Sequence, residues 1–420
     1  GKYLFKASIR KDGSSRFGKA NRYGIFPAFS AGWVLSKEDF LSSSDVISLL
    51  KLRASWGKTG NAEIGNFASR DLWNAASYKQ LPAIEPAQPE SPNLTWEKSS
   101  QTDIGLDFGV FNNRVSGEID FYNKKTNGLL FYQNIPYTSG YSNIYRNIGD
   151  MKNTGFEIVI NTQNIKKDNF TWDTNFNVAK NNNEITALPD DNRDQIIGNV
   201  IRRVGERLDS FYLVEYAGVD PNNGDALFYK NTLNPDGSLD KTKTNDYSEA
   251  QRIIAGSSTP DWIAGLTNTV EYKNFDFSFT FYGEFGGNLY NSGGKFMSTS
   301  ASNGYDNQTV DQMNRWQNPG DITNVPQARL GKGNGVEEST RYLEKNDFVR
   351  LRNLSLGYTF NKNLTSSIGV NKLRLYVSAI NVLTFTKYSG YDPEARSDTN
   401  RGGGGSTFYS APPAKTVTFG

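Results

Sequence analysis

The sequence predicts an all-β protein: a transmembrane, antiparallel, up-and-down β-barrel to which this chain contributes about 14 strands. Three observations support that fold class. Apolar and polar residues alternate along segments of strand length, the connections between these segments are alternately short and long, and the composition is polar but rich in aromatic residues. Of the 420 residues, 13% are aromatic, and the mean hydropathy is −0.60. Barrel strands with one lipid-facing side and one water-facing side average out as polar in this way.

The alternation of apolar and polar residues identifies the strands. Residues 103–110 read DIGLDFGV, and residues 274–281 read NFDFSFTF. The same alternation recurs in residues 114–121, 170–178, 354–360 and 372–380. A period of two over about eight residues indicates strands that have one apolar and one polar face. In 274–281 we therefore expect one side to face lipid and the other to face the lumen, namely Phe275, Phe277, Phe279 and Phe281 against Asp276, Ser278 and Thr280.

The lengths of the connections predict a membrane barrel instead of a soluble β-fold. Short turns are expected at 112–113, 166–168 and 273–274. Long connections, rich in Gly, Asn, Ser and Tyr, are expected at 60–95, 125–152, 182–206, 231–259, 286–344 and 383–413. In an up-and-down sheet this alternation places every short turn at one rim and every long loop at the other, as in outer-membrane barrels with short periplasmic turns and long extracellular loops. A sandwich or a propeller has no reason to sort its loops in this way.

Strand length and tryptophan positions agree with a membrane barrel. Ten residues at ~3.3 Å each, tilted by ~45°, span roughly 23 Å, close to the apolar band of about 25 Å in such barrels. Tryptophans lie near the ends of several expected strands, at Trp33, Trp56, Trp96, Trp172 and Trp262. Amphipathic rings gather at membrane–water interfaces, although tryptophan also caps the core of soluble β-proteins. The best candidate for a helix is the short segment 308–317, inside a long loop.

The composition excludes several classes of function. The net charge is only +2, from 46 basic and 44 acidic residues, so no bulk field attracts nucleic acid. The chain contains neither cysteine nor histidine, which removes the usual ligands of zinc, haem and copper and rules out a Ser-His-Asp triad. The sequence has no run of about 18 apolar residues, so it predicts no transmembrane helix. We therefore expect no enzyme activity and no cofactor, and only carboxylate chemistry or carboxylate-bound Ca²⁺ remains open.

Two short motifs approach known ligand sites and are better interpreted as turns. Residues 13–20, GSSRFGKA, approach a phosphate-binding loop, but Ala20 lacks the hydroxyl that reaches Mg²⁺, and the residues that follow predict a strand instead of a helix. Residues 218–229, GVDPNNGDALFY, approach a calcium loop that starts at Asp220. Its glycine comes one position early, and Asn231 stands where a bidentate Glu is needed. Both segments are expected to be polar connections between strands.

Three tyrosines are the candidates for contact with a ligand. Tyr137, Tyr141 and Tyr145 recur every four residues in IPYTSGYSNIYRNIGD, a segment rich in Ser and Asn. Aromatic faces with amide and hydroxyl neighbours suit sugar rings or peptide backbones. The alternative is that these rings pack the loop against its neighbours.

Segments spread over nearly the whole chain resemble SusC/RagA-type TonB-dependent outer-membrane transporters of Bacteroidetes. They are LFKASIRKDGSSRFG, RYGIFPAFSAGWVLSKEDFL, LKLRASWGKTGN, PNLTWEKSSQTDIGLDFGVFNNRVSGEIDFYNKKTNGLL, NIGDMKNTGFEIVINT, FVRLRNLSLGYTF and LRLYVSAINVLTFTKYSGYDPE. In this family DGSSRFG is typical of a barrel hairpin, which agrees with the turn expected at 13–20.

The resemblance implies that residues 1–420 are the C-terminal part of a barrel of about 22 strands, with about 8 strands and the plug domain upstream of residue 1. It implies a location in the outer membrane of a Gram-negative bacterium, in contact with lipid, and active import of oligosaccharides or oligopeptides. It also implies two partners, a SusD-like lipoprotein that closes over the extracellular loops and the TonB complex, which acts through the N-terminal region. Polar side chains would line the lumen around the plug, among them Asp103, Asp107, Glu118 and Asp120.

Two other functions stay open at this point. The chain could be a transporter-like barrel that serves as a structural subunit of an outer-membrane secretion or assembly complex. It could also be a soluble, surface-exposed β-protein that binds glycans. The identity of a substrate does not follow from the sequence.

Overall fold

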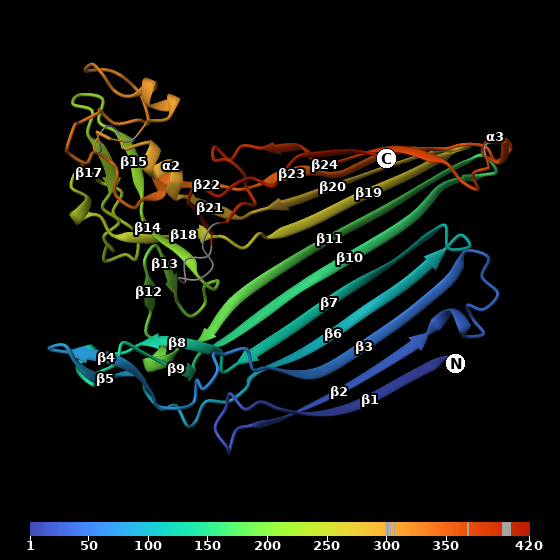
Figure 1. Cartoon of the computed structure of the whole chain (residues 1–420), viewed down its shortest axis with the longest axis horizontal. Helices are drawn as coiled ribbons and strands as arrows, with labels where there is room; N and C mark the ends of the chain where they lie inside the picture. The colour runs from blue at the N-terminus through green and yellow to red at the C-terminus, as the bar shows by residue number, and fades with distance from the viewer. Residues whose placement is uncertain (300–301, 303, 306, 368, 397–404) are drawn as a thin grey trace. The chain divides into compact units, whose positions relative to one another are not determined.

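The computed structural model describes the whole chain except residues 300–301, 303, 306, 368 and 397–404. The chain folds as two compact units, which Figure 1 shows in one view. The first unit comprises Gly1–Gln163, Ala179–Asp194 and Arg203–Glu206. The second comprises Asn164–Val178, Gln195–Arg202 and Arg207–Gly420.

The principal element is a twelve-stranded antiparallel sheet in which each strand pairs with the one that follows it in the sheet order. In that order the strands are β1 (Tyr3–Gly13), β2 (Tyr23–Val34), β3 (Ile47–Asn61), β6 (Glu97–Val110), β7 (Val115–Asn127), β10 (Asp150–Lys167), β11 (Phe170–Ala187), β19 (Trp262–Tyr272), β20 (Phe275–Phe285), β23 (Phe348–Thr359), β24 (Arg374–Thr386) and β26 (Thr416–Phe419). Sheet order and chain order are the same. The predicted all-β, up-and-down architecture is therefore confirmed.

The sheet has twelve strands where the alternation of residues suggested about 14. The difference arises in the segment between the long connections 182–206 and 231–259. There the chain forms β14 (Ser210–Val214), β15 (Tyr216–Val219) and β16 (Ala226–Tyr229), which pair in two small sheets of their own. Five or fewer residues are too short to cross an apolar band of about 25 Å.

From β3 onward the connections alternate between short and long as expected, with one exception: residues 360–373, which include α3, join β23 to β24 where a short turn would continue the pattern. Residues 111–114 join β6 to β7, residues 168–169 join β10 to β11, and residues 273–274 join β19 to β20. The intervening connections are long, at 62–96, 128–149, 188–261, 286–347 and 387–415. Asn112 and Asn113 make the first short turn possible because their φ angles, +58° and +60°, lie in the left-handed region that asparagine tolerates.

The two faces of β20 are those that the period of two predicted. On one face, the rings of Phe277 and Phe281 each lie 5.7 Å from the ring of Phe279. On the other face, the Thr280 hydroxyl lies 3.0 Å from the hydroxyl of Thr267, and Asp276 pairs with Arg374. Phenylalanine side chains and polar side chains therefore project from opposite sides of this strand.

Aromatic residues gather where strands of the second unit meet their short turns. The ring of Phe170 lies 6.3 Å from that of Tyr272. Tyr358 lies 4.7 Å from Phe275 and 5.0 Å from Phe360. These residues belong to, or immediately follow, the ends of β11, β19, β20 and β23. A row of amphipathic rings at one level of a sheet is typical of a membrane–water interface.

The expectation for the tryptophans holds only in part. Trp33 lies at the end of β2 and stacks on Tyr3, with 6.4 Å between ring centroids. Trp96 is instead buried among apolar side chains and contacts the rings of Phe17 and Phe26. For Trp96, the capping of a protein core is thus the correct explanation.

The long connections contain their own small sheets, which lie at one end of the strands of each unit (Figure 1). The first unit has two hairpins, β4 (Leu72–Tyr78) with β5 (Leu81–Gln88) and β8 (Leu130–Asn134) with β9 (Asn143–Asn147). In the second unit, a four-stranded sheet has the strand order β12 (Gln195–Ile197), β13 (Val200–Arg202), β14 and β18 (Arg252–Ser257). The second unit also contains the order β15, β16, β17 (Lys243–Thr244) and the order β22 (Leu343–Lys345), β21 (Asn288–Asn291), β25 (Ser406–Thr407).

The buried hydrophobic clusters draw most of their residues from the connections, although single buried side chains such as Val34, Phe348 and Leu351 lie on strands of the large sheet. One cluster contains Phe17, Phe26, Ile64, Ala68, Leu94 and Trp96, a second contains Val200, Phe211, Leu213, Tyr290 and Tyr342, and a third contains Val214, Ala226, Phe228 and Ala250. The large sheet instead exposes aromatic and aliphatic side chains, such as Phe5 at 82% and Ile9 at 76%. Exposed apolar faces on a large scale indicate a surface that something other than water covers.

Helical structure is scarce in the part of the chain that the structure describes. It contains α1 (Pro189–Asn192), α2 (Ser292–Met297) and α3 (Lys362–Ser367), and the helix expected within 308–317 is a 3₁₀ turn at Val310–Asn314. Within the described residues, no helix has the length and apolar character needed to cross a membrane.

Candidate ligand-binding site in the long connections

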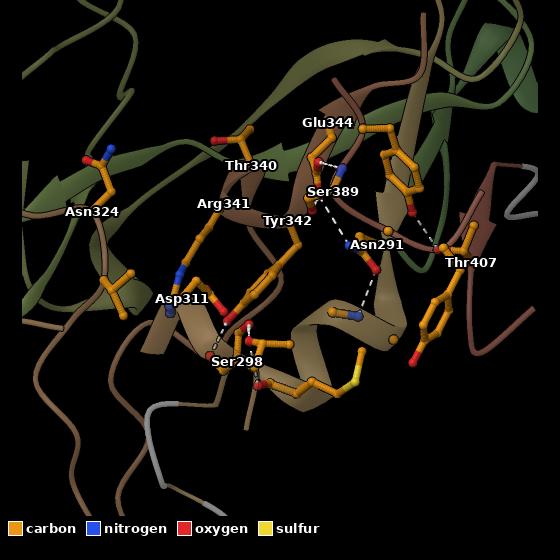
Figure 2. Close-up of a pocket in the computed structure, with 18 of the residues that line it drawn as sticks. Asn291, Ser298, Asp311, Asn324, Thr340, Arg341, Tyr342, Glu344, Ser389 and Thr407 are labelled. Carbon is orange, nitrogen blue, oxygen red and sulfur yellow. Dashed lines mark hydrogen bonds between the residues drawn. The ribbon is translucent and has the colours of Figure 1, made fainter. Parts of the chain in front are cut away.

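A cavity of about 930 Å³ lies among the long connections of the second unit (Figure 2). Its walls come from segments far apart in the sequence: residues 216–218, 291–298, 309–311, 340–344 and 388–395. The sheet that contains β21, β22 and β25 brings two of these segments, 291–298 and 340–344, together with Thr407, because β21 pairs with β22 on one side and with β25 on the other. The site is thus assembled by pairing between connections that follow different strands of the large sheet.

Six tyrosines line this cavity: Tyr216, Tyr229, Tyr342, Tyr388, Tyr391 and Tyr409. Three of them are fixed by their hydroxyl groups. The Tyr216 hydroxyl donates to the carbonyl oxygen of Asn324 at 3.0 Å, that of Tyr342 donates to the carbonyl oxygen of Gly335 at 3.0 Å, and that of Tyr388 lies 2.9 Å from Thr407 Oγ1. These rings are parts of a preformed wall.

The other rings at the cavity are more accessible. Tyr391 is 65% exposed and Tyr409 is 49% exposed. Burial raises the pKa of Tyr216 to about 12 and, likewise, the pKa of Tyr388 to about 12. Both fixed hydroxyls therefore stay protonated and uncharged at any physiological pH.

Charged side chains complete the lining, namely Arg341 and the carboxylates of Asp311, Glu344 and Asp392. The guanidinium of Arg341 lies 5.2 Å from the ring centroid of Tyr342 and 5.8 Å from that of Tyr216, and its Nη1 donates to the carbonyl oxygen of Gly335 at 2.8 Å. Asp311 is exposed and lies on the same side of the cavity (Figure 2). Ser389 and Arg350 bind the carboxylates of Glu344 and Asp392. Aromatic faces and polar groups therefore dominate the accessible lining, which suits a polar ligand such as a chain of sugars or a peptide backbone.

Glu344 holds three of the wall segments together. Its carboxylate accepts hydrogen bonds from the Ser389 backbone N–H at 2.8 Å and the Ser389 hydroxyl at 2.7 Å, and from Asn291 Nδ2 at 3.2 Å (Figure 2). The Asn291 side chain in turn accepts from the Gly294 N–H at 2.7 Å and caps α2. Because one carboxylate joins β21, β22 and residue 389, the cavity is formed before any ligand enters.

A buried ion network fixes another part of the wall and was not anticipated from the sequence. Arg350, on β23, is 1% exposed and pairs with Asp392 at 2.5 Å and with Glu394 at 2.8 Å. Arg352 also pairs with Glu394. Asp392 lines the cavity. The network therefore attaches the cavity wall at residues 391–394 to the start of a strand of the large sheet. The signal in the sequence was the pair of arginines in FVRLRN, at positions that an ordinary strand core would fill with apolar residues.

The three candidate tyrosines lie in the first unit and differ from one another in environment. Tyr137 is 84% exposed, in a 3₁₀ turn. The Tyr141 hydroxyl donates to Asp71 Oδ1 at 3.2 Å. Tyr145, on β9, packs against the buried cluster around Trp96, and its ring lies 4.6 Å from that of Tyr132. The alternative of loop packing applies to Tyr145, whereas Tyr137 keeps a ring accessible to a ligand.

The two turn-like motifs are turns in the structure. Residues 14–22 connect β1 to β2, with Phe17 buried beneath them and a hydrogen bond of 3.0 Å from the Ser14 N–H to the Arg22 carbonyl oxygen. In the second turn, Asp220 Oδ1 accepts from the Asn222 N–H at 2.9 Å, and Asp225 pairs with Arg329 at 2.5 Å. The described residues contain no group of three or more acidic side chains placed to hold a metal ion.

The carboxylates expected in a lumen do share the polar face of the first unit's sheet. They surround Arg53, which contacts Asp107 at 2.7 Å, Asp103 and Glu118 at 3.4 Å each, and Asp120. Lys51 adds a second contact to Asp107 at 2.7 Å. A network of charges over strands β3, β6 and β7 marks a hydrated surface, because a face in lipid could not hold so many ions.

Known proteins resemble this chain throughout. The family model described as TonB dependent receptor-like, beta-barrel matches residues 1–382. TonB-dependent receptor P3 of Formosa agariphila is 36% identical over an alignment of 443 residues that includes 100% of this chain and 44% of that protein. TonB-dependent receptor SusC of Bacteroides thetaiotaomicron is 34% identical, over 94% of this chain and 40% of its own length.

The fold matches solved structures to a similar extent. The RagAB peptide transporter aligns with a TM-score of 0.89 and 31% identity, over 99% of this chain and 45% of the transporter chain. The same importer in its open-open state aligns with a TM-score of 0.87. This chain thus spans less than half the length of the relatives that it matches.

Proposed function

This chain belongs to the TonB-dependent receptor β-barrel family, and from that premise we propose that the protein imports bulky nutrients, oligosaccharides or oligopeptides, across the outer membrane of a bacterium of the Bacteroidetes. The observation that supports this most directly is the preformed cavity lined with tyrosines on the side of the long connections. Its lining of tyrosine rings and polar groups suits the repeating units of either polymer class. The relatives include a protein named SusC and one described as a peptide transporter. The proposal therefore covers both oligosaccharides and oligopeptides.

We also propose that residues 1–420 are the C-terminal part of the barrel, with the plug and further strands upstream. The chain covers 44% of the receptor P3. In addition, β1 and β26 stand at the two ends of the strand order, and a barrel in lipid needs a partner for every strand edge. The proposed partners are a SusD-like lipoprotein over the long connections and the TonB complex on the periplasmic side.

The orientation of the barrel gives one testable expectation. Because the chain has no cysteine, a single introduced cysteine is the one thiol of the chain, and its labelling reports whether that position is accessible. Ile322→Cys and Leu81→Cys, both in long connections and highly exposed, should react with a membrane-impermeant maleimide on intact cells. Lys167→Cys, at the end of β10 beside a short turn, should react only after the cells are opened. Equal labelling of all three positions on intact cells would contradict the topology.

The cavity gives a test of the import function. In a strain that lacks the gene, the wild-type gene should restore growth on an oligosaccharide or an oligopeptide from a defined panel. The variant Tyr391→Ala/Tyr409→Ala should weaken binding of that nutrient about tenfold, equivalent to about 1.4 kcal/mol, and should slow growth at limiting concentration. Growth on the corresponding monomer should not change. Tyr78→Ala, an exposed tyrosine on the β4–β5 hairpin, is the matched control.

The same assay tests the tyrosine segment. We propose that Tyr137, Tyr141 and Tyr145 lie along the path of the nutrient, with direct contact expected first from Tyr137 because its ring is accessible. Tyr137→Ala should impair uptake without a change in the amount of folded barrel. Normal growth of every tyrosine variant on the whole panel, with wild-type dependence established, would exclude both groups of rings as nutrient contacts.

A further inference from the structure

A lysine, an asparagine and a glutamate meet in the small sheet of β15, β16 and β17. Glu215 directly precedes β15, Asn231 closely follows β16, and Lys241 closely precedes β17. Backbone hydrogen bonds place these segments next to one another, from the Tyr229 N–H to the Glu215 carbonyl oxygen at 3.0 Å and from the Asn231 N–H to the Asp240 carbonyl oxygen at 2.8 Å. The three side chains therefore come from three neighbouring segments of one unit.

The three side chains contact one another in a closed triangle. Lys241 Nζ lies 2.9 Å from Asn231 Oδ1 and 2.5 Å from Glu215 Oε2. Asn231 Nδ2 donates to the same Glu215 Oε2 at 3.1 Å. Asn231 is 3% exposed, and its φ of +52° lies in the left-handed region that asparagine tolerates. The ring of Tyr229 lies 5.1 Å from Lys241 Nζ. The carboxamide is thus fixed and buried beside the amine.

We propose that Lys241 and Asn231 become joined by an intramolecular isopeptide bond, with Glu215 as the group that transfers protons. Lys241 Nζ gives a proton to Glu215 and attacks Asn231 Cγ as a neutral amine. The Nζ–Cγ bond forms, the Cγ–Nδ2 bond breaks, and Nδ2 leaves as ammonia after it has received a proton through Glu215. The ammonia then takes up the proton that Glu215 still holds and leaves as ammonium, which restores the Glu215 carboxylate. The reaction needs no oxidant and no other reactant.

The geometry distinguishes this arrangement from a simple ion pair. An ion pair requires only the lysine and the glutamate. Here one carboxylate oxygen contacts both the nitrogen that must lose a proton and the nitrogen that must gain one, each within the reach of a general acid–base group. The contact of Nζ with Asn231 Oδ1 places the amine beside the carbonyl carbon that it would attack. The exposed side of Lys241, whose side chain is 51% accessible, leaves ammonia a route to water.

The bond would close a hairpin in a surface connection. Between Asn231 and Lys241, the chain turns at Asn234 and Ser238, which are joined by a backbone hydrogen bond of 2.9 Å. Exposed turns of this kind are preferred sites of proteolytic cleavage. A cross-link at its base would keep a cleaved hairpin attached, and it would hold Tyr229 in the wall of the cavity.

Mass spectrometry of the purified, full-length transporter tests the proposal. Tryptic digestion of an unlinked chain cuts after Lys230, Lys241 and Lys243, and it releases residues 231–241 at their full mass. In the linked chain Lys241 resists trypsin, and residues 231–243 appear lighter by one ammonia, with no backbone fragments between 231 and 241. Cyclisation of an asparagine alone also loses ammonia, but it leaves Lys241 open to trypsin.

Three variants define the roles of the residues. Lys241→Arg keeps the charge and Asn231→Ala removes the carboxamide, and each should abolish the mass loss. Glu215→Gln keeps both reacting groups and should leave most of the protein unlinked. Full-mass release of residues 231–241 from the wild type would overturn the proposal, and complete linkage in Glu215→Gln would overturn the role of the carboxylate.

Discussion

Arg350→Met should destabilise the segment that Arg350 holds by about 3–5 kcal/mol, because removal of one partner leaves buried charges without compensation. Arg350 is 1% exposed and faces Asp392 and Glu394, whose side chains are 8% and 18% accessible. Both acids lie in the connection after β24, so the loss should appear as local opening of that connection. Hydrogen exchange of residues 388–395 in the purified protein measures it, and exchange in that segment should accelerate at least a hundredfold, corresponding to about 2.7 kcal/mol.

Arg352→Met is the matched control for Arg350→Met. Arg352 lies two residues further along the same strand, pairs with Glu394 and is 30% accessible. An ion pair that water reaches contributes about 0–1 kcal/mol, so exchange at 388–395 should change little. Equal acceleration in the two variants would show that the buried network does not hold the connection. Unchanged exchange in Arg350→Met would lead to the same conclusion.

Phe279→Arg should sharply lower the amount of folded barrel in the outer membrane. Phe279 lies near the middle of β20 between Phe277 and Phe281 on the apolar face. A cation on the lipid side near the middle of the bilayer costs roughly 2–4 kcal/mol. Ser278→Arg is the matched control, since it places the same charge one residue away on the polar face. The measurement is the fraction of heat-resistant, folded protein in outer-membrane preparations.

A soluble β-core would also suffer from Phe279→Arg, so lipid exposure has to be measured separately. A spin label at residue 279 should be relaxed by an agent that dissolves in the bilayer, and a label at residue 278 by an agent that dissolves in water. If a label at 279 were shielded from both agents, the phenylalanine face would have to pack against protein, and the barrel would not meet lipid there.

The sequence predicted the large sheet well because a strand that separates two solvents shows its pairing in local order. Residues 103–110 and 274–281 indicated which side chains share a face, and the short turns at 112–113 and 273–274 indicated where strands end. The carboxylates around Arg53 followed from the same rule, because each alternates with an apolar neighbour. These features depend on residues one or two positions apart.

The cavity could not be predicted in the same way because its contacts join distant residues. Arg350 and Asp392 are 42 residues apart, and Tyr216 N–H bonds Thr340 Oγ1 across 124 residues. No period marks such partners. The tyrosines at 137, 141 and 145 are a second example of what local order cannot predict. Their regular spacing indicated a candidate site, but it could not reveal that Tyr145 packs beside Trp96.

The hydrophobic clusters of the connections have an evolutionary consequence. Each cluster draws its buried residues from the connections and from the strand ends next to them. The middle parts of the long strands are stabilised instead by backbone hydrogen bonds to neighbouring strands and by the medium that covers the sheet. Selection can therefore change neighbouring connections that share one interior, such as 188–261 and 286–347, while the strands of the large sheet are inherited nearly unchanged. Connections exchanged between relatives should fold when all the connections that share one hydrophobic cluster are moved together with the residues of that cluster. They should fail to fold when a single connection is moved without its cluster.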